Sequence, residues 1–246
     1  MYDKLREVVC QANIESAASG LVICSWGNVS GIDRSAGVVA IKPSGVSYDE
    51  LSAEKMVLVD LDGNVLPAVP LRENRGGREG TLRPSSDTPT HLELYRNFEA
   101  IGGICHTHSL NATMWAQACR EIPCFGTTHA DYFYGPIPVT EAMTEKEIKS
   151  DYELNTGKVI VRRFADLDPM KMPAVLVANH GPFTWGRTAA DAVEAAFVLE
   201  QIATIALGTI TINPNQNQIS KALLDKHYLR KHGKNAYYGQ IDDSKG

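Results

Sequence analysis

The alternation of apolar and polar residues divides the chain into helices and strands. Apolar residues at helical spacing predict helices, and short apolar runs bounded by glycine, proline or polar residues predict buried strands. Helices are expected over residues 3–18, 87–98, 109–119, 144–152, 188–207 and 219–231. Strands are expected over residues 21–24, 37–41, 102–108 and 174–178, and a hairpin joins 56–61 to 64–66 around Asp62-Gly63. This order of elements favours one α/β domain.

Two stretches have no clear periodicity. Residues 25–31 are too polar and too rich in glycine for a core element and are predicted to form a loop. Residues 71–82 mix three glycines with arginine and glutamate, which predicts a mobile surface loop.

The strand over residues 102–108 ends in two histidines. Strand side chains alternate between faces, so Ile104, His106 and His108 are expected on one face, with the histidine Cβ atoms roughly 7 Å apart. Two imidazoles at that separation can bind one divalent ion such as zinc. The same pattern also fits an ordinary buried strand, and the octapeptide alone leaves both interpretations open. His180 ends another predicted strand, at an edge where sites are commonly built.

Composition and charge narrow the classes of function. The 246 residues are 43% hydrophobic and 22% charged, with a formal net charge of −5. A mildly acidic chain without a basic run is not expected to bind nucleic acid or an anionic membrane. The charged start is unlike a signal peptide, and we expect no apolar run long enough to span a bilayer. Five cysteines without a Cys-x-x-Cys pair predict a reduced, cytoplasmic protein.

Two further features have both a structural and a functional interpretation. The turn Lys42-Pro43-Ser44-Gly45 offers amides and an ammonium group to a phosphate, although such turns are also common at strand ends. Asp87 stands at the start of a predicted helix with Pro89 in the first turn, which favours a helix-capping role.

Taken together and in order, these motifs resemble the class II aldolase/epimerase family, and within it the L-ribulose-5-phosphate 4-epimerases. The resemblance rests on residues 21–30, 41–46, 84–91, 102–109, 127–135, 180–186 and 223–240. It implies an α/β fold in which a central, largely antiparallel β-sheet is covered by helices in three layers. One domain is expected over residues 1–240, with a polar tail over 241–246. The 71–82 loop is longer than the usual connection of the family.

The resemblance implies a metal-dependent interconversion of L-ribulose 5-phosphate and D-xylulose 5-phosphate, in carbohydrate catabolism of L-arabinose or of ascorbate. The hydrogen on C4 is β to the C2 carbonyl and is not acidified, so inversion requires cleavage of the C3–C4 bond. Retro-aldol cleavage gives an enediolate and glycolaldehyde phosphate, and re-addition to the other face of the aldehyde inverts C4. This chemistry requires a Lewis acid, a phosphate anchor and a proton relay on each side of C4.

The family match also assigns roles to individual residues. The metal ligands are His106, His108 and His180, with Asp87 as a fourth ligand or orienting group; zinc is expected, with manganese or cobalt as replacements. The phosphate and substrate cradle comprises Asn28, Lys42, Ser44, Gly45, Ser85 and Ser86. The acid–base residues are Asp131 and Tyr238 on opposite sides of C4, with His227 near the substrate. From the residues alone, Asp131 would cap a loop and Tyr238 would pack on the surface.

The resemblance further implies a homotetramer in which His227 and Tyr238 reach the site of a neighbouring subunit. Three alternative functions fit part of this sequence. An aldolase would release its ketone product, and aldolase relatives carry a glutamate base where this chain has Asp87. A non-catalytic scaffold of the same fold has no need of three histidines. A zinc hydrolase requires a glutamate at helical spacing to a histidine pair, which is missing here.

Overall fold

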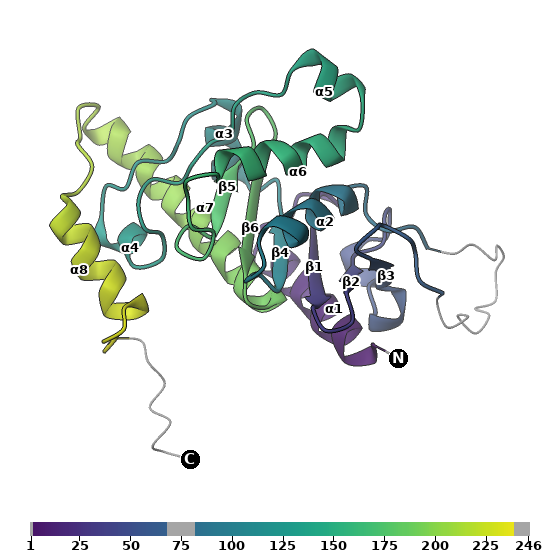
Figure 1. Cartoon of the computed structure of the whole chain (residues 1–246). Coiled ribbons are helices and arrows are strands. Elements are labelled where there is room, and N and C mark those ends of the chain that lie inside the picture. Colours follow the sequence, from purple (N-terminus) through teal and green to yellow (C-terminus); the bar gives the residue numbers. More distant parts are fainter. Residues whose placement is uncertain (1, 68–81, 239–246) are drawn as a thin grey trace.

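Six strands form the sheet that carries the candidate site (Figure 1). The computed structural model describes residues 2–67 and 82–238. The strands are β1 (Asn28–Asp33), β2 (Val38–Ile41), β3 (Val57–Asp60), β4 (Gly103–His106), β5 (Ala174–Leu176) and β6 (Pro182–Gly186). They lie in the order β3-β2-β1-β4-β6-β5, and every neighbouring pair is antiparallel. The strand with the first histidine is therefore in the middle of the sheet.

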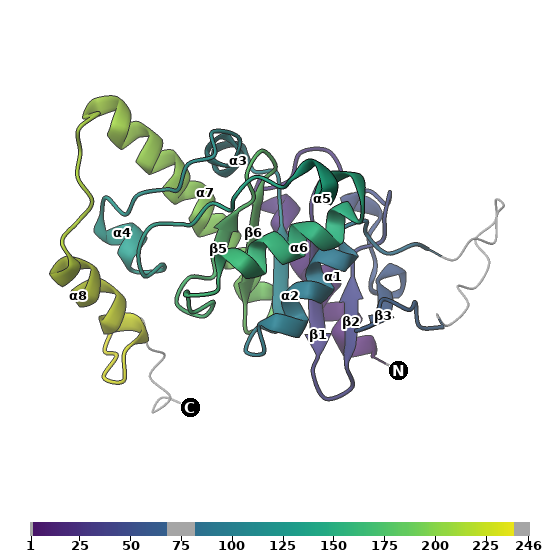
Figure 2. The same cartoon turned by 45° about the horizontal axis from the view of Figure 1, so that its top comes forward.

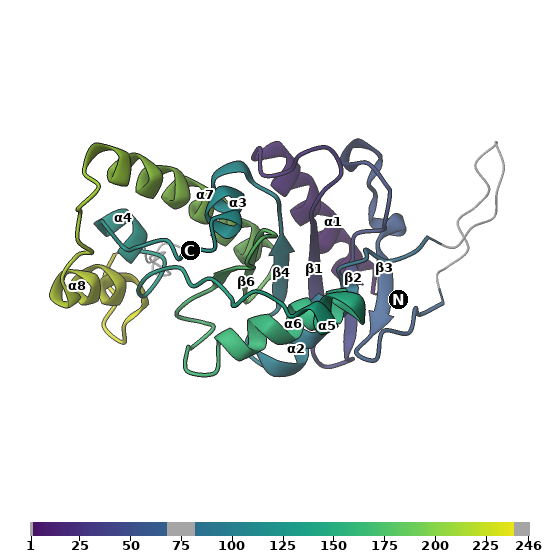
Figure 3. The same ribbon diagram turned by 90° about the horizontal axis from the view of Figure 1, so that it is seen from above.

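Helices cover both faces of this sheet. They are α1 (Asp3–Ala18), α2 (Thr88–Asn97), α3 (Leu110–Gln117), α4 (Thr127–Ala130), α5 (Glu145–Lys149), α6 (Tyr152–Arg163), α7 (Ala189–Ile212) and α8 (Lys221–His232), with 3-10 turns η1 (Tyr48–Glu50) and η2 (Ala53–Lys55). Seen from above, α1 and α7 lie on one side of the strands, and α2 and α6 lie on the other (Figure 3). This arrangement confirms the predicted α/β fold with an antiparallel sheet between helical layers.

A row of three glycines crosses the middle of the sheet. Gly103 on β4 pairs with Gly31 on β1 and with Gly186 on β6. A Cβ at Gly103 would lie 2.4 Å from the backbone of Ala189, and one at Gly186 would lie 2.3 Å from the Cβ of Asp191. The missing side chains let the first turn of α7 approach the strands closely.

Helix α7 is the longest and most apolar helix among the described residues. Thr188 and Asp191 form a capping box at its start. Its mean hydropathy of 1.7 would allow a membrane span by length and composition, which differs from the expectation that no run is long enough. In the fold one side of α7 packs against β4 and β6, and about a third of its most apolar stretch is buried.

The first strand differs from its prediction. Residues 21–24 form no strand and lead into a turn at Cys24 and Ser25, and β1 occupies most of the stretch predicted to be a loop. The polar groups of β1 are buried because they have partners. The side chain of Asn13 exchanges two hydrogen bonds with the backbone of Val29, at 2.9 and 3.0 Å. The hydroxyl of Ser30 lies 2.7 Å from Nδ1 of His91. Hydropathy alone does not reveal such partners.

Other boundaries also shift. The helix predicted over 144–152 is the shorter α5, and the sequence did not predict α6 or β6. The second arm of the hairpin is a single bridge from Val65 to Val59. All of the 71–82 loop except Leu82 lies outside the described residues, as does the tail over 241–246.

Candidate active site

Three histidines from separate segments meet at one end of the central strands. His106 ends β4, His108 lies in the link from β4 to α3, and His180 lies in the turn between β5 and β6. One ligand nitrogen from each ring lies within 4.8 Å of the other two. The strand stops at His106, so the prediction of one continuous strand through His108 is wrong, although both rings reach the same place.

The ring of His106 is fixed on two sides. Phe183, its partner across the sheet, stacks on it with ring centroids 4.1 Å apart and planes 12° apart. Nδ1 of His106 lies 2.9 Å from the carbonyl oxygen of Pro182. Because a carbonyl can only accept, Nδ1–H is the donor, and Nε2 keeps its lone pair for a metal.

The turn that carries His180 is held by its neighbours. Asn179 adopts a left-handed conformation with φ of 62° and donates its N–H to the carbonyl of Ala116, at 2.9 Å. A Cβ at Gly181 would lie 2.9 Å from the carbonyl oxygen of Thr107, so this position requires glycine. The two histidine-bearing segments are therefore in direct backbone contact.

The charge state of the histidines suits a metal centre. Burial, followed by the neighbouring imidazoles, lowers the pKa of His108 to about 4 and that of His180 to about 3. Both rings are therefore neutral at pH 7 and carry free lone pairs. Nδ1 of His180 is buried and has no hydrogen-bond partner within the described part of the chain. The neutral imidazoles of His108 and His180, one of them with an unpartnered nitrogen, and the Nε2 of His106 fit a divalent ion of the zinc class.

Asp87 stands at the N-cap position of α2, but its side chain makes no capping hydrogen bond. The helix-capping interpretation is wrong because the carboxylate instead accepts a 2.6 Å hydrogen bond from Nδ2 of Asn28. Burial alone would raise the pKa of Asp87, but His106, His91, this hydrogen bond and His180 together lower it. Asp87 is thus an anion whose charge is felt at the three histidines.

Asn28 links the strands to the candidate cradle. It pairs with His106 across β1 and β4, and its Nδ2 also donates to Oγ of Ser85 at 3.0 Å. Its Oδ1 is buried without a partner among residues 2–67 and 82–238. A buried amide oxygen of this kind is available to a hydroxyl group of a ligand.

The remaining cradle residues lie on two adjacent turns. The N–H of Ser85 donates to the carbonyl of Lys42 at 3.0 Å, and the N–H of Ser44 donates at 2.9 Å to the carbonyl two residues before Ser85. Gly45 has a φ of 72° and open space around it, and Ser86 is exposed. The structure brings these predicted residues together.

The ammonium group of Lys42 contacts groups outside the candidate phosphate cradle. Its ammonium group is buried, donates to the carbonyl of Val46 at 2.7 Å and lies 4.8 Å from the centre of the Tyr48 ring. Burial lowers the pKa of Lys42. A phosphate contact from this residue would require exchange of the Val46 partner.

The predicted acid–base residues form a second group. Asp131 follows α4, and its carboxylate accepts hydrogen bonds from His227 at 3.0 Å and from Arg230 at 2.8 Å. Arg230 also lies over the ring of Tyr238, 4.3 Å from its centre. Burial would raise the pKa of Asp131, but the hydrogen bonds from Arg230 and His227 lower it overall. The carboxylate form of Asp131 is therefore favoured at neutral pH.

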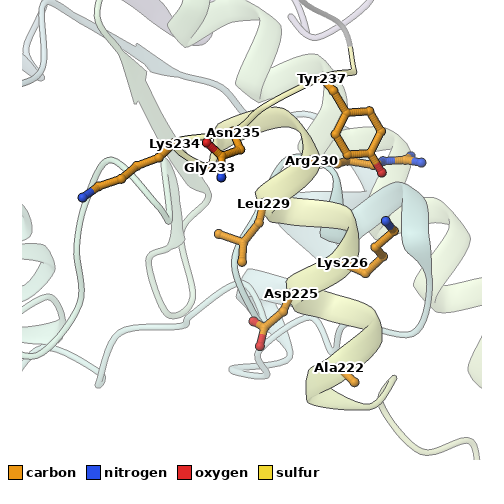
Figure 4. Close-up of a pocket in the computed structure, with 9 residues that line it drawn as sticks. All are labelled: Ala222, Asp225, Lys226, Leu229, Arg230, Gly233, Lys234, Asn235 and Tyr237. Atoms are coloured by element: carbon orange, nitrogen blue, oxygen red, sulfur yellow. The ribbon is translucent and has the colours of Figure 1, made fainter.

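This second group is remote from the histidines within one chain. In all views α4 and α8 lie together at one end of the molecule, whereas β4 is in the centre (Figures 1 and 2). No hydrogen bond or ion pair among the described residues joins the two groups. A cavity of about 410 Å³ borders α8, with Lys226, Arg230 and Tyr237 in its lining (Figure 4). Arg230 is the member of this second group that lines the cavity, and none of the three histidines does.

Four residues at these two groups were not predicted. Phe183 stacks on His106, and Arg230 pairs with Asp131. Trp26 and Tyr152 stand at the edges of the histidine site, with ring centroids 6.0 Å from His108 and 6.2 Å from His180, respectively. Arg230 could have been found because it follows His227 by three residues, which places both side chains on one helical face.

Comparisons with known proteins identify the family and the fold. Residues 7–207 match the family described as Class II Aldolase and Adducin N-terminal domain. An L-fuculose 1-phosphate aldolase superposes with a TM-score of 0.73 and 22% sequence identity, covering 91% of this chain and 94% of that chain. A second one, from Glaciozyma antarctica, has a TM-score of 0.72 and 17% identity, covering 92% and 80%. YgbL from Klebsiella pneumoniae, a putative aldolase/epimerase/decarboxylase, has a TM-score of 0.67 and 22% identity, covering 92% and 98%. At these identities the structural likeness shows the fold.

Proposed function

Because the chain belongs to the class II aldolase and adducin N-terminal domain family, we propose that it is a divalent-metal-dependent epimerase. Its substrates are L-ribulose 5-phosphate and D-xylulose 5-phosphate. The observation that carries the proposal is the cluster of His106, His108 and His180, with Asp87 and Asn28 beside it. A scaffold without activity would not need three imidazoles around one point.

When bound, a divalent ion, zinc by the donor set, supplies Lewis acidity toward the negative charge that develops as the C3–C4 bond breaks. The residues of the chain bind and orient the substrate. Asn28 holds Asp87 by its Nδ2 and presents its Oδ1 to a substrate hydroxyl. The turns with Ser44 and Ser85 present amides and hydroxyls to the 5-phosphate. Substrate is thus anchored at one end and polarised at the other.

Proton transfer at the C4 oxygen falls to Asp131 and Tyr238. Asp131 is ionised and accepts the proton as the bond breaks, and Tyr238 donates one on the opposite face of the rotated aldehyde. Within one chain these groups are far from the histidines (Figure 1). This separation supports a site shared between subunits, and with the family resemblance we propose a homotetramer in which α4 and α8 of one subunit complete the site of its neighbour.

The first test is conversion of L-ribulose 5-phosphate to D-xylulose 5-phosphate, measured before chelation, after chelation and after zinc is restored. Activity should disappear with the metal and return with zinc. Manganese and cobalt are tested in the same way because both can replace zinc at such sites. A zinc-loaded chain that converts neither sugar phosphate would disprove the epimerase assignment.

The second test is subunit complementation. His106→Asn removes a metal ligand, Tyr238→Phe removes a proton donor, and each variant alone should be inactive. When the two are unfolded, mixed in equal amounts and refolded together, about a quarter of the sites should receive both intact groups from different chains. Refolded single variants are the control. If the mixture stays as inactive as its parts, each site lies within one chain.

A sugar-phosphate aldolase is the second candidate, because two of the compared structures are L-fuculose 1-phosphate aldolases. Asp87 at the metal centre, where aldolase relatives carry glutamate, favours the epimerase. Trapping of free aldehyde with a coupled dehydrogenase separates the two. An epimerase keeps its aldehyde bound between cleavage and re-addition, whereas an aldolase releases one aldehyde per turnover.

We also propose a cytoplasmic location and a role in the catabolism of L-arabinose or of ascorbate. All five cysteines are free, including Cys10, Cys105 and Cys124 in the interior. Free buried thiols are typical of a reducing compartment.

A further inference from the structure

Helix α3 is linked through the backbone to the segments that carry two of the three histidines. It begins at Leu110, two residues after His108, with Ser109 at its N-cap position. At its other end, the carbonyl of Ala116 accepts the N–H of Asn179, the residue before His180, at 2.9 Å. A shift of α3 would therefore move His108 and His180 together.

The first turn of α3 is fixed by a carboxylate from another helix. Glu200 on α7 accepts the backbone N–H of Asn111 at 2.8 Å with Oε1 and that of Ala112 at 3.0 Å with Oε2. Oε1 also accepts the side-chain amide of Asn111 at 2.8 Å. Ser109 makes no side-chain capping bond, so the carboxylate of Glu200 is the hydrogen-bond acceptor for these two backbone donors. Its negative charge also matches the positive end of the helix dipole.

A series of contacts through α7 and α3 connects the sheet to the histidines. The glycine row seats the start of α7 against β4 and β6, and Glu200 lies further along the same helix. A second contact between α3 and α7 is the hydrogen bond from Nε1 of Trp115 to the carbonyl of Ala203, at 3.1 Å. Helix α7 thus holds α3 at both its first and its last turns.

We propose that Glu200 is a positioning residue of the metal centre. Its carboxylate fixes the N-terminus of α3 and thereby the separation of His108 and His180. This inference rests on the proposed metal site but not on the identity of the substrate. Residues that orient metal ligands from outside the coordination sphere typically change metal affinity by 10–100-fold.

The test compares Glu200→Gln with the parent chain, each fully folded and well below its melting temperature. Zinc affinity is measured by competition with a chromophoric chelator, and ligand geometry by the visible absorption of cobalt(II). Glu200→Gln should weaken zinc binding by about tenfold and change the cobalt spectrum. The amide keeps one acceptor oxygen, so one of the two backbone donors loses its partner.

Two control variants separate positioning from other effects. Glu194→Gln removes the same charge from α7 at an exposed position, and Trp115→Phe removes the other hydrogen bond between α7 and α3. Glu194→Gln should keep zinc affinity within about twofold of the parent, whereas Trp115→Phe should melt earlier and weaken zinc binding less than Glu200→Gln, because it releases only the last turn of α3. Should Glu200→Gln fail to fold, Glu200→Asp serves instead, because it keeps the charge but cannot reach both backbone donors.

The outcomes are distinguishable. A parent chain that binds zinc and cobalt, with unchanged affinity and spectrum in the Glu200 variants, overturns the positioning role alone. A parent chain that binds neither metal overturns the proposed function and this inference with it. Weaker binding in the Glu194→Gln control to the same extent as in Glu200→Gln would show a general charge effect and would also overturn the inference.

Discussion

Gly103→Ala should destabilise the protein strongly, although alanine fits the backbone conformation of this strand residue. The added Cβ would lie 2.4 Å from the backbone of Ala189 and from the carbonyl oxygen of Thr188. Normal carbon contacts begin near 3.5 Å, so the start of α7 would have to retreat by about 1 Å. Overpacking costs about 1–3 kcal/mol, and the backbone atoms at this contact cannot rotate away. We expect about 3 kcal/mol, at the upper end of that range.

Thermal and urea unfolding measure this effect. A loss of about 3 kcal/mol corresponds to a fall in Tm of about 6–12 °C in a protein of this size. The matched control is Gly208→Ala on the exposed side of α7, where a Cβ meets nothing within 4 Å. This change should stabilise the protein by about 0.5–1 kcal/mol, because alanine is the better helix former. A Gly103→Ala chain that melts within one or two degrees of the parent would refute the role of the glycine row.

Three further predictions follow from single contacts. Burial lowers the pKa of His129 to about 4, so protonation of the unfolded chain should cost about 2 kcal/mol of stability as the pH falls from 7 to 5. His129→Gln should lessen this fall in urea titrations, and equal losses in both proteins would contradict it. Arg34 donates to three carbonyl groups at or just after the C-terminal end of α2. Arg34→Ala should therefore lower the free energy of unfolding by about 1–3 kcal/mol in the same urea titrations. An unchanged midpoint would argue against these hydrogen bonds. Arg230→Met removes a donor that lowers the pKa of Asp131. The acidic limb of the pH–activity profile should therefore move to higher pH. A limb that does not move would exclude Asp131 as the base.

Much of the fold could be predicted because local signals agree with it. The predicted helix over residues 3–18 matches α1, and Gly20 after it has a φ of 72°, as a helix stop requires. Thr188 caps α7 as its sequence position indicates. Strand β1 could not be predicted in this way, because its polar residues are buried by partners far away in sequence, such as Asn13.

The site was predictable in composition but not in arrangement. The motif match named the three histidines that the structure gathers within 4.8 Å. The family pattern could not show that Asp131 pairs with Arg230 on α8, nor that this pair is distant from the histidines in the same chain. Such distances depend on the tertiary placement of α8, which no local pattern determines.

The two groups of the site also differ in how firmly the fold holds them. His106 is on a central strand with hydrogen-bonded neighbours on both sides, whereas only Tyr228 of α8 is buried. Local opening of α8 therefore requires less free energy than opening of β4, and hydrogen exchange should be fast in α8 and slow in β4. An isolated subunit would then spend part of its time with an ordered metal-binding centre and a detached proton relay. In the proposed tetramer, docking against a neighbour would hold α8 in place, so that assembly of the subunits itself would order the proposed proton relay.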